Sequence, residues 1–291
     1  YTEFAIRHPN PFYLRTRQRG LQNWDGKLKY ITKTGQFKIG LLPSVYKRCI
    51  ELGIKPIIVD MRQPLPKVSK VVTQIGKYKL RPEQEKAVKA ILSNKLGETP
   101  FQIGVLDYTV NAGKTLIMSA LYLSYKKQLK TLLITNDSDW LNQARDEFKQ
   151  YLPGEDITFV QGKVLNWSNF TIGMVQSISR NMKYYQNELA KIDMVLIDEA
   201  DQGGSKQYQN VITRLFNTRV RIGLSGTIYM SKLAKDKVKN MNLRCFFGDV
   251  IAEFKLKDSI KKGYSTKTVV KTVESKPWFG NWESDCMASV R

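Results

Sequence analysis

From about residue 76 onward, short apolar runs alternate with longer stretches in which apolar residues recur at helical spacing. We expect the apolar runs to be strands: PFQIGVL, TLLITN, ITFV, TIGMV, MVLID and VRIGLSG. The amphipathic stretches predict helices: GKTLIMSALYLSYKK, SDWLNQARDEFKQYL and SKQYQNVITRLF. This alternation predicts an α/β fold in which helices cover both faces of a mostly parallel sheet.

The first 75 residues have a different rhythm. Turn signals such as Asp25-Gly26 separate short β-like runs, which are FAIR, KLKYIT and QFKIGLL. Residues 44–53 predict one helix that ends at Gly53, and two prolines, Pro64 and Pro66, then indicate a linker. We therefore expect three parts: a small basic α+β domain (1–75), a larger α/β domain (76–263) and the start of a further part (264–291).

The charge of the chain points to a polyanionic partner. The 291 residues include 47 Lys and Arg against 26 Asp and Glu, a net charge of +21. The charge is uneven, because the first 80 residues hold 16 basic and only four acidic residues. Basic side chains placed on phosphates release counterions, which favours binding to nucleic acid. A generally basic surface without such a partner is the alternative.

Composition also excludes several classes of protein. The three cysteines, Cys49, Cys245 and Cys286, are far apart, and His8 is the one histidine, so neither a zinc site nor a catalytic His triad is expected. Separated thiols are typical of a reducing compartment. We find no apolar run near the roughly 20 residues of a membrane span and no signal peptide, and therefore expect a cytoplasmic protein without membrane partners.

The segment VLDYTVNAGKTLIMSAL (105–121) has the layout of a phosphate-binding loop, with an apolar strand, a loop and then a helix. Lys114 is expected to reach the β- and γ-phosphates of ATP, and the Thr115 hydroxyl to bind Mg²⁺. Tyr108 stands where the full pattern has its first glycine. Taken alone, the motif also fits a helix that starts at a glycine and has a surface lysine. The expected ATP-binding residues here are Thr109, Asn111, Ala112, Gly113, Lys114 and Thr115.

A second apolar strand, MVLID, ends in the paired carboxylates Asp198 and Glu199. In a nucleotide-hydrolysing site, Asp198 would hold Mg²⁺ through water, and Glu199 would orient and deprotonate the attacking water. Lys114, Asp198 and Glu199 are thus the expected catalytic residues. A third strand ends in Ser225-Gly226-Thr227. Asp198 and Glu199 begin the sequence DEAD (198–201). We expect the Ser225 and Thr227 hydroxyls to form hydrogen bonds with the carboxylates of this DEAD sequence and to couple hydrolysis to movement.

In this order and spacing, GKT, DEAD and SGT resemble motifs I, II and III of superfamily 2 helicases. The resemblance implies a RecA-like domain. Upstream, Leu80-Arg81-Pro82-Glu83-Gln84 resembles the element in which a glutamine reads adenine. This likeness implies that Gln84 specifies the base and that Tyr78 or Arg81 packs near it.

Two further elements resemble the parts of these helicases that touch the nucleic-acid backbone. Thr135-Asn136-Asp137 stands at motif Ia, where the family usually has Pro-Thr, so the contacts there are altered. Residues 173–177 resemble motif Ib, which implies that Gln176 contacts nucleic acid.

Residues 23–27, NWDGK, resemble the NWDGR element of the UvsW-type helicases of tailed phages, a likeness that extends over about residues 10–270. Motif II departs from it, because Ala200-Asp201 stands where the phage motif ends in Cys-His. The resemblance implies an ATP- and Mg²⁺-dependent DNA helicase of recombination and DNA repair. Such an enzyme unwinds forks and junctions and drives branch migration, and if this chain is phage-encoded it would do so in the cytoplasm of the host.

Basic and aromatic residues alternate in the N-terminal part, where rings could stack on unpaired bases beside neutralised phosphates. Alternatively, the rings fill a small core, which is the reading we favour for Trp24. The expected nucleic-acid contacts are Arg15, Arg17, Arg19, Lys27 and Lys29.

A superfamily 2 motor needs a second RecA-like domain, which supplies an arginine finger. Residues 264–291 are too short for it, so we expect the N-terminal part of a longer protein, monomeric and weakly active alone. Three alternatives stay open: a translocase subunit without strand separation, a nucleotide-dependent DNA-binding or annealing module, and an RNA helicase.

Overall fold

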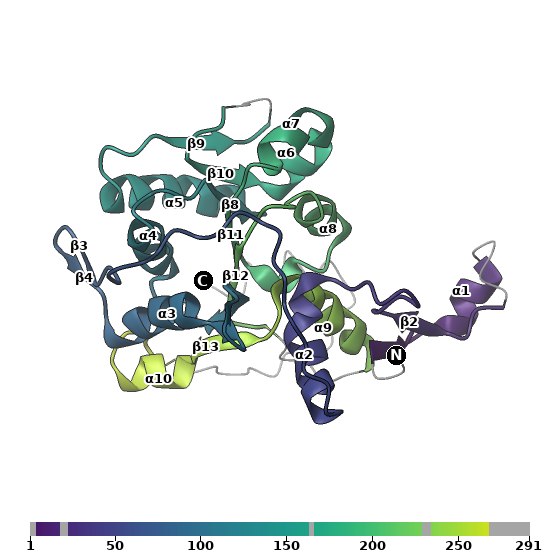
Figure 1. Cartoon of the computed structure of the whole chain (residues 1–291). Coiled ribbons are helices and arrows are strands. Elements are labelled where there is room, and N and C mark those ends of the chain that lie inside the picture. Colours follow the sequence, from purple (N-terminus) through teal and green to yellow (C-terminus); the bar gives the residue numbers. More distant parts are fainter. Residues whose placement is uncertain (1–3, 18–22, 163–165, 229–233, 268–291) are drawn as a thin grey trace, which may run out of the picture.

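A seven-stranded parallel sheet forms the centre of the molecule (Figure 1). The computed structural model describes residues 4–17, 23–162, 166–228 and 234–267. The strand order is β13-β7-β12-β11-β8-β10-β9. The expected RecA-like α/β fold is confirmed, and six of the seven strands are the predicted ones. The strands are β7 (Ile103–Tyr108), β8 (Thr131–Thr135), β9 (Ile157–Val160), β10 (Phe170–Met174), β11 (Met194–Asp198), β12 (Val220–Ser225) and β13 (Val250–Phe254).

The inner strands are apolar throughout because both faces of the sheet are covered. Every residue of β7, β8, β11 and β12 is buried, whereas the edge strand β9 buries only Val160. A continuous apolar run of this kind is what a parallel sheet between two helical layers requires.

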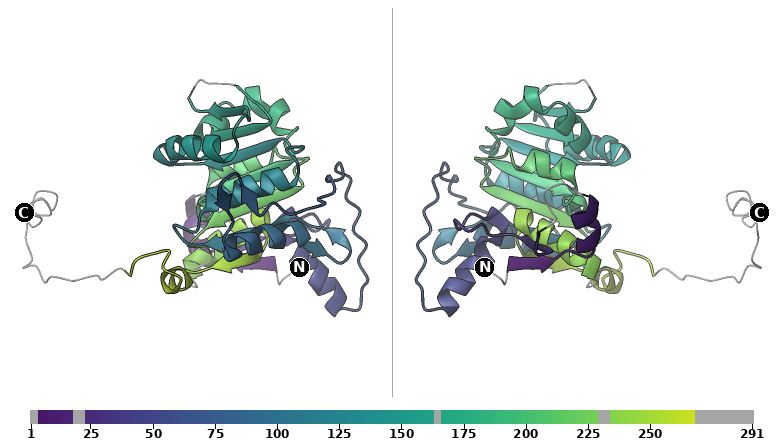
Figure 2. Two further views of the ribbon diagram at one scale, coloured as in Figure 1. Left: turned by 90° about the vertical axis from the view of Figure 1, so that its left-hand side faces the viewer. Right: turned by 90° about the vertical axis from the view of Figure 1, so that its right-hand side faces the viewer.

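Two layers of helices enclose the sheet (Figures 1 and 2). Side chains alternate between the layers along each strand, so that Leu106 packs in one core cluster and Val105 in the other. The first layer contains α3 (Pro82–Ser93), α4 (Lys114–Ser124) and α5 (Ser138–Tyr151). The second contains α6 (Val175–Arg180), α7 (Met182–Leu189), α8 (Lys206–Ile212) and α9 (Ala234–Phe247).

The N-terminal residues form small elements beside α9. Strand β1 (Ala5–Arg7) pairs antiparallel with β2 (Lys27–Lys29), with α1 (Pro11–Arg17) between them. The predicted helix is α2 (Leu42–Glu51), and it ends close to Gly53. The boundary at residue 75 stays a prediction, since Leu41 from this part is fully buried in the α9-side core.

The predicted strand QFKIGLL is wrong. Residues Ile39–Leu41 form a 3₁₀ turn, η2, that leads into α2. The reason is tertiary contact: a Cβ built on Gly40 would lie 2.1 Å from the Arg244 carbonyl oxygen and 2.7 Å from the Gly248 nitrogen. Only a glycine lets this backbone pass so close to the end of α9.

Residues 54–73 have no regular secondary structure and lead into the first of two short hairpins, while the second follows α3. These pair β3 (Gln74–Ile75) with β4 (Tyr78–Lys79), and β5 (Lys95–Leu96) with β6 (Thr99–Pro100). The segment is held to the sheet by Asp60, whose carboxylate lies 2.7 Å from Arg62 and 3.2 Å from Arg219. The last described helix is α10 (Leu256–Lys261). Within the described ranges, no helix is long and apolar enough to cross a membrane.

Candidate ATP-binding site

The three motif segments meet at the carboxyl edge of the sheet. The loop after β7 leads into α4, Asp198 ends β11 and Ser225 ends β12. Because β12 lies between β7 and β11, the order of the strands brings these segments side by side. Carboxyl ends of parallel strands are the usual place for ligands in open α/β sheets.

The loop before α4 has the backbone geometry of a phosphate cradle. Gly113 caps the helix with φ of 73°, and Asn111 has φ of 62°. The positive φ of Gly113 strains any residue with a Cβ, so the position favours glycine, and an added Cβ would also displace the Gln84 amide, whose Nε2 atom would lie 2.3 Å away. The Leu116 and Ile117 N–H groups donate to the Gly113 carbonyl at 3.1 and 3.2 Å, so the amides of Lys114 and Thr115 precede the first bonds of the helix and favour an anion. Thr109, Ala112 and Thr115 are buried beside this loop.

Lys114 lies between the two carboxylates. Its Nζ atom is 3.1 Å from Asp198 Oδ1 and 3.5 Å from Glu199 Oε1. Asp198 is almost fully buried, so its charge depends on a cation close by. The structure therefore brings together the three residues expected to be catalytic, although they are far apart in the sequence.

The donor set here fits Mg²⁺. Apart from its ion pair with Lys114, the buried Asp198 Oδ1 atom has no hydrogen-bond partner among the residues that the structure describes. In the same described part, no group of three or more His, Cys, Asp or Glu side chains is arranged so that it could hold a metal ion by itself. Mg²⁺ commonly uses one or two protein oxygens, with water and substrate phosphates completing its shell. A carboxylate at Asp198 and a hydroxyl at Thr115 meet that need.

Glu199 combines an unusual backbone with a shifted carboxyl group. Its φ is 50°, the left-handed region, which costs a residue other than glycine on the order of 1–3 kcal/mol. Burial raises the pKa of its carboxyl, with Lys114 opposing the shift and Asp198 and Asp201 adding to it. The side chain is still 41% exposed, so water reaches it.

The SGT motif contacts Asp201, whereas Lys114 of the GKT motif contacts Asp198 and Glu199. Ser225 Oγ donates a hydrogen bond of 3.0 Å to Asp201 Oδ1. The Thr227 backbone N–H donates to Ser225 Oγ at 3.2 Å, and the two hydroxyl oxygens are 3.3 Å apart. Among the described residues, the link between DEAD and SGT thus runs through Asp201.

Gln84 faces the phosphate loop. Its Nε2 donates to the Ala112 carbonyl at 2.9 Å, and its Oε1 accepts from the Arg81 N–H at 2.9 Å. Arg81 Nη2 also donates to the Asn111 carbonyl at 3.1 Å. A role of Gln84 in reading adenine stays a prediction, and the amide would have to exchange a partner to make that contact. Tyr78 instead packs edge-on against Tyr151.

A polar chain that the sequence did not reveal joins the expected nucleic-acid elements to motif II. Gln176 Nε2 donates to the Asn136 carbonyl at 3.3 Å. Asn136 Nδ2 donates in turn to Gln202 Oε1 at 2.6 Å, one residue beyond the DEAD sequence. Asn136 is the position at which motif Ia departs from the family. The unusual residue at position 136 could have drawn attention to this part of the sequence. Nothing in the sequence, however, indicates that its partner is Gln202, 66 residues away.

The expected N-terminal DNA contacts make mostly local bonds here. Arg15 donates to the Trp24 carbonyl at 2.8 Å, and Lys29 lies 3.0 Å from Asp25. Trp24 Nε1 donates to the Lys27 carbonyl at 2.9 Å, so Trp24 closes a turn. Arg17 lies over the Tyr13 ring, Lys27 is exposed, and Arg19 is outside the described residues.

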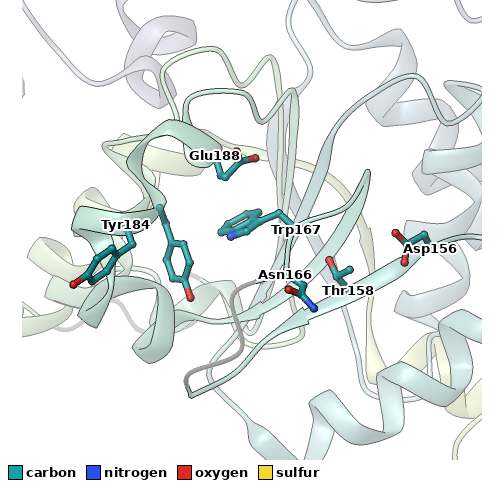
Figure 3. A pocket seen from close by; sticks show the side chains of 7 residues that line it. Asp156, Thr158, Asn166, Trp167, Tyr184 and Glu188 are labelled. Carbon is teal, nitrogen blue, oxygen red and sulfur yellow. The ribbon is translucent and has the colours of Figure 1, made fainter.

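A separate hollow of about 640 Å³ lies beside the edge strand β9 (Figure 3). Its walls come from the start of β9, the residues before β10, and α7. It is therefore near the amino ends of these strands, whereas the ATP-site residues lie at carboxyl ends. The lining residues are Asp156, Thr158, Asn166, Trp167, Tyr184, Tyr185 and Glu188.

A RecA-like sheet with these three motif segments at its carboxyl edge defines a superfamily 2 ATPase of the helicase type. Comparison with known proteins gives the family. The model described as "Type III restriction enzyme, res subunit" matches residues 77–230, and the chain belongs to that family.

Similar proteins agree with this class. The chain is 22% identical over 272 residues to the ATP-dependent DNA helicase uvsW of Enterobacteria phage T4, covering 86% of this chain and 51% of that protein. It is 26% identical over 147 residues to the putative ATP-dependent RNA helicase L396 of Acanthamoeba polyphaga mimivirus, covering 50% of this chain and 27% of that protein. The chain thus spans about half, or less, of these curated relatives.

A solved structure shows the same fold. The crystal structure of the UvsW helicase from bacteriophage T4 matches with a TM-score of 0.65 and 21% identity, over 86% of this chain and 90% of that one. The resemblance to superfamily 2 helicases of the UvsW type is therefore confirmed.

Proposed function

We propose that this chain is the N-terminal part of an ATP-dependent DNA helicase or translocase that acts on branched DNA. The single observation that supports it most is the meeting of Lys114 with Asp198 and Glu199 beside the phosphate loop. The name of the T4 relative, an ATP-dependent DNA helicase, favours DNA as the nucleic acid. The net charge of +21 favours a polyanion of either kind.

In the proposed reaction, the triphosphate binds at the start of α4, where backbone N–H groups and Lys114 face its oxygens. Mg²⁺, held by Thr115 and Asp198, would neutralise charge on the β- and γ-phosphates. Glu199 accepts the proton of the attacking water, and its raised pKa makes it a better base than an ordinary carboxylate. Asp201, at the end of the DEAD sequence, would couple ATP hydrolysis to Ser225 and Thr227 through its hydrogen bond with Ser225.

The proposed motor also needs a second RecA-like domain. The match spans 51% of the T4 helicase, which leaves room for a second RecA-like domain in the longer protein. That domain would supply the positive charge that stabilises the transferring phosphoryl group. We expect hydrolysis by residues 1–291 alone to be weak, and the longer protein to act as a monomer.

A translocase subunit without strand separation is the second candidate. It is favoured by the family description, which names a restriction enzyme subunit. A strand-separation assay on forked DNA distinguishes the two, because a pure translocase hydrolyses ATP on DNA without releasing a strand.

The proposal is tested by ATPase rates with forked DNA, with RNA and without nucleic acid. Both this chain and the longer protein that contains it are measured, each as wild type, Lys114→Ala and Lys149→Ala. Lys149 is an exposed lysine of α5 and serves as the control. We expect DNA-stimulated hydrolysis in the longer protein that Lys114→Ala abolishes and Lys149→Ala keeps. Stimulation by RNA alone contradicts the DNA assignment, and no turnover under any condition contradicts the ATPase.

A further inference from the structure

Tyr264, at the end of the described chain, lies against the predicted adenine-binding element. The Arg81 guanidinium carbon is 4.2 Å from the centre of the Tyr264 ring. Tyr264 follows α10, in the segment that leaves the first RecA-like domain. A residue distant in sequence from the phosphate loop thus touches a side chain that bonds directly to it.

The turn that carries Tyr264 is fixed in place. The Tyr264 N–H donates to the Ser259 carbonyl at 2.9 Å, and the hydroxyls of Ser259 and Ser265 are 2.8 Å apart. Lys262 Nζ lies 2.8 Å from the buried carboxylate of Glu83. These contacts anchor the backbone that carries the ring, and the ring itself lies against Phe254, with the two ring centres 6.4 Å apart. The position of the ring in turn limits where the guanidinium can lie.

Arg81 is restrained on its edges as well as on its Tyr264 face. Its Nη2 donates to the Asn111 carbonyl at 3.1 Å, and its Nε is 3.4 Å from Glu83 Oε1. The side chain is still 27% exposed, so part of the guanidinium stays open. Planar guanidinium groups stack on aromatic faces, and a nucleobase offers such a face.

We propose that Tyr264 positions Arg81 for the base of the nucleotide, by holding the guanidinium plane so that its open part packs on adenine. This inference rests on the proposed ATP binding. Tyr264 acts through Arg81 and needs no contact with the nucleotide itself. The segment that leaves the domain then responds to an occupied base site, because the Arg81–Tyr264 contact belongs to both.

The test compares two ligands that differ in the base. Binding of ADP and of inorganic tripolyphosphate is measured by calorimetry for the wild type, Tyr264→Ala, Tyr264→Phe and Tyr184→Ala. Tyr184 is a 74% exposed tyrosine of α7 beside the other hollow and is the matched control. We expect Tyr264→Ala to weaken ADP binding about fivefold to tenfold, in the range of a partly buried cation–π contact, and to leave tripolyphosphate unchanged. Tyr264→Phe keeps the ring and should bind ADP like the wild type.

A double variant of Tyr264 and Arg81 shows whether Tyr264 affects ADP binding through Arg81 or independently of it. If Tyr264 acts through Arg81, then Tyr264→Ala adds no further loss of ADP affinity in an Arg81→Ala background. Equal weakening of both ligands by Tyr264→Ala overturns the inference, since it indicates general disruption. So does unchanged ADP binding in that variant while the wild type binds ADP. A wild type that binds neither ligand contradicts the proposed ATP binding, which is a different failure.

Discussion

At the scale of single residues, the site is built around a lysine with two acidic neighbours. Lys114 lies between Asp198 and Glu199, and phosphate oxygens would compete with these carboxylates for it. Glu199 is held in a left-handed backbone conformation, where only specific surroundings keep a residue with a side chain. Strain of this kind gathers at functional positions, which supports a role for Glu199 in the chemistry.

Replacing Glu199 by Gln should remove the base and keep the site. We expect hydrolysis by the longer protein to fall about 10²- to 10⁴-fold, the usual contribution of a general base, with ADP binding retained. The pKa of Glu199 is raised above 4.5, so the wild-type rate should fall as the pH drops through that raised value, because the protonated carboxyl cannot accept a proton. Steady-state rates between pH 5 and 8 check both points.

Glu188→Gln is the control for this experiment. Glu188 pairs with Lys130 and Lys191 away from the site, so its loss should leave the rate within about twofold. A Glu199→Gln protein that hydrolyses ATP normally, or one that no longer binds ADP, would contradict the assignment.

Which site residues the sequence could predict depends on how they are encoded. Lys114, Asp198 and Ser225 belong to short contiguous motifs, each placed after a buried strand. The partners of these motifs are not encoded in this way. The Asn136–Gln202 bond joins residues 66 positions apart, and the Tyr264 stack on Arg81 depends on where α10 packs. No local pattern indicates either contact.

At the scale of elements, burial decided which strands the sequence predicts. The fully buried strands β7, β8, β11 and β12 read as continuous apolar runs, which is the signal of a covered parallel sheet. Strand β13 was missed because Glu253 interrupts the apolar run of its sequence, VIAEF, whereas β9, the strand at the other edge, has the uninterrupted sequence ITFV. The predicted strand QFKIGLL is wrong because the contact of Gly40 with α9 overrides its β-like composition.

The contact at Gly40 predicts a large effect of one methyl group. Gly40→Ala should lower the free energy of unfolding by about 1–3 kcal/mol, because the added Cβ meets backbone atoms of α9 that cannot rotate away. Urea unfolding, compared at equal m value, measures this change. Gly204→Ala is the control, since its Cβ would have ordinary contacts of 3.8 Å or more. If the two variants are equally stable, η2 does not pack against α9 as described.

At the scale of the whole molecule, basic charge is concentrated in the N-terminal part. The structure places several of these side chains in local bonds, so in the proposed binding of DNA they would act through long-range charge as well as through direct contact. Neutralising one exposed lysine should therefore weaken the affinity for all DNA sequences by the same factor.

Lys27→Gln tests this view of the N-terminal part. If Lys27 lies on a phosphate, the slope of log affinity against log salt should become shallower by about one, equally for two unrelated DNA sequences. Fluorescence anisotropy over a series of salt concentrations measures the slope. Lys149→Gln removes the same charge from α5 and should leave the slope unchanged. A Lys27→Gln slope equal to that of the wild type would place DNA elsewhere on the molecule.

The grouping of charge around Lys114 has a consequence for which form of nucleotide enters. The Lys114 ammonium lies beside two carboxylates, those of Asp198 and Glu199, and the charge of Asp201 also acts on Glu199. These carboxylates would repel a triphosphate that arrives without a metal ion. The same triphosphate already complexed with a divalent cation presents the compensating charge to the carboxylates as it arrives. We therefore expect the proposed ATP site to bind metal-complexed nucleotide in preference to the free anion.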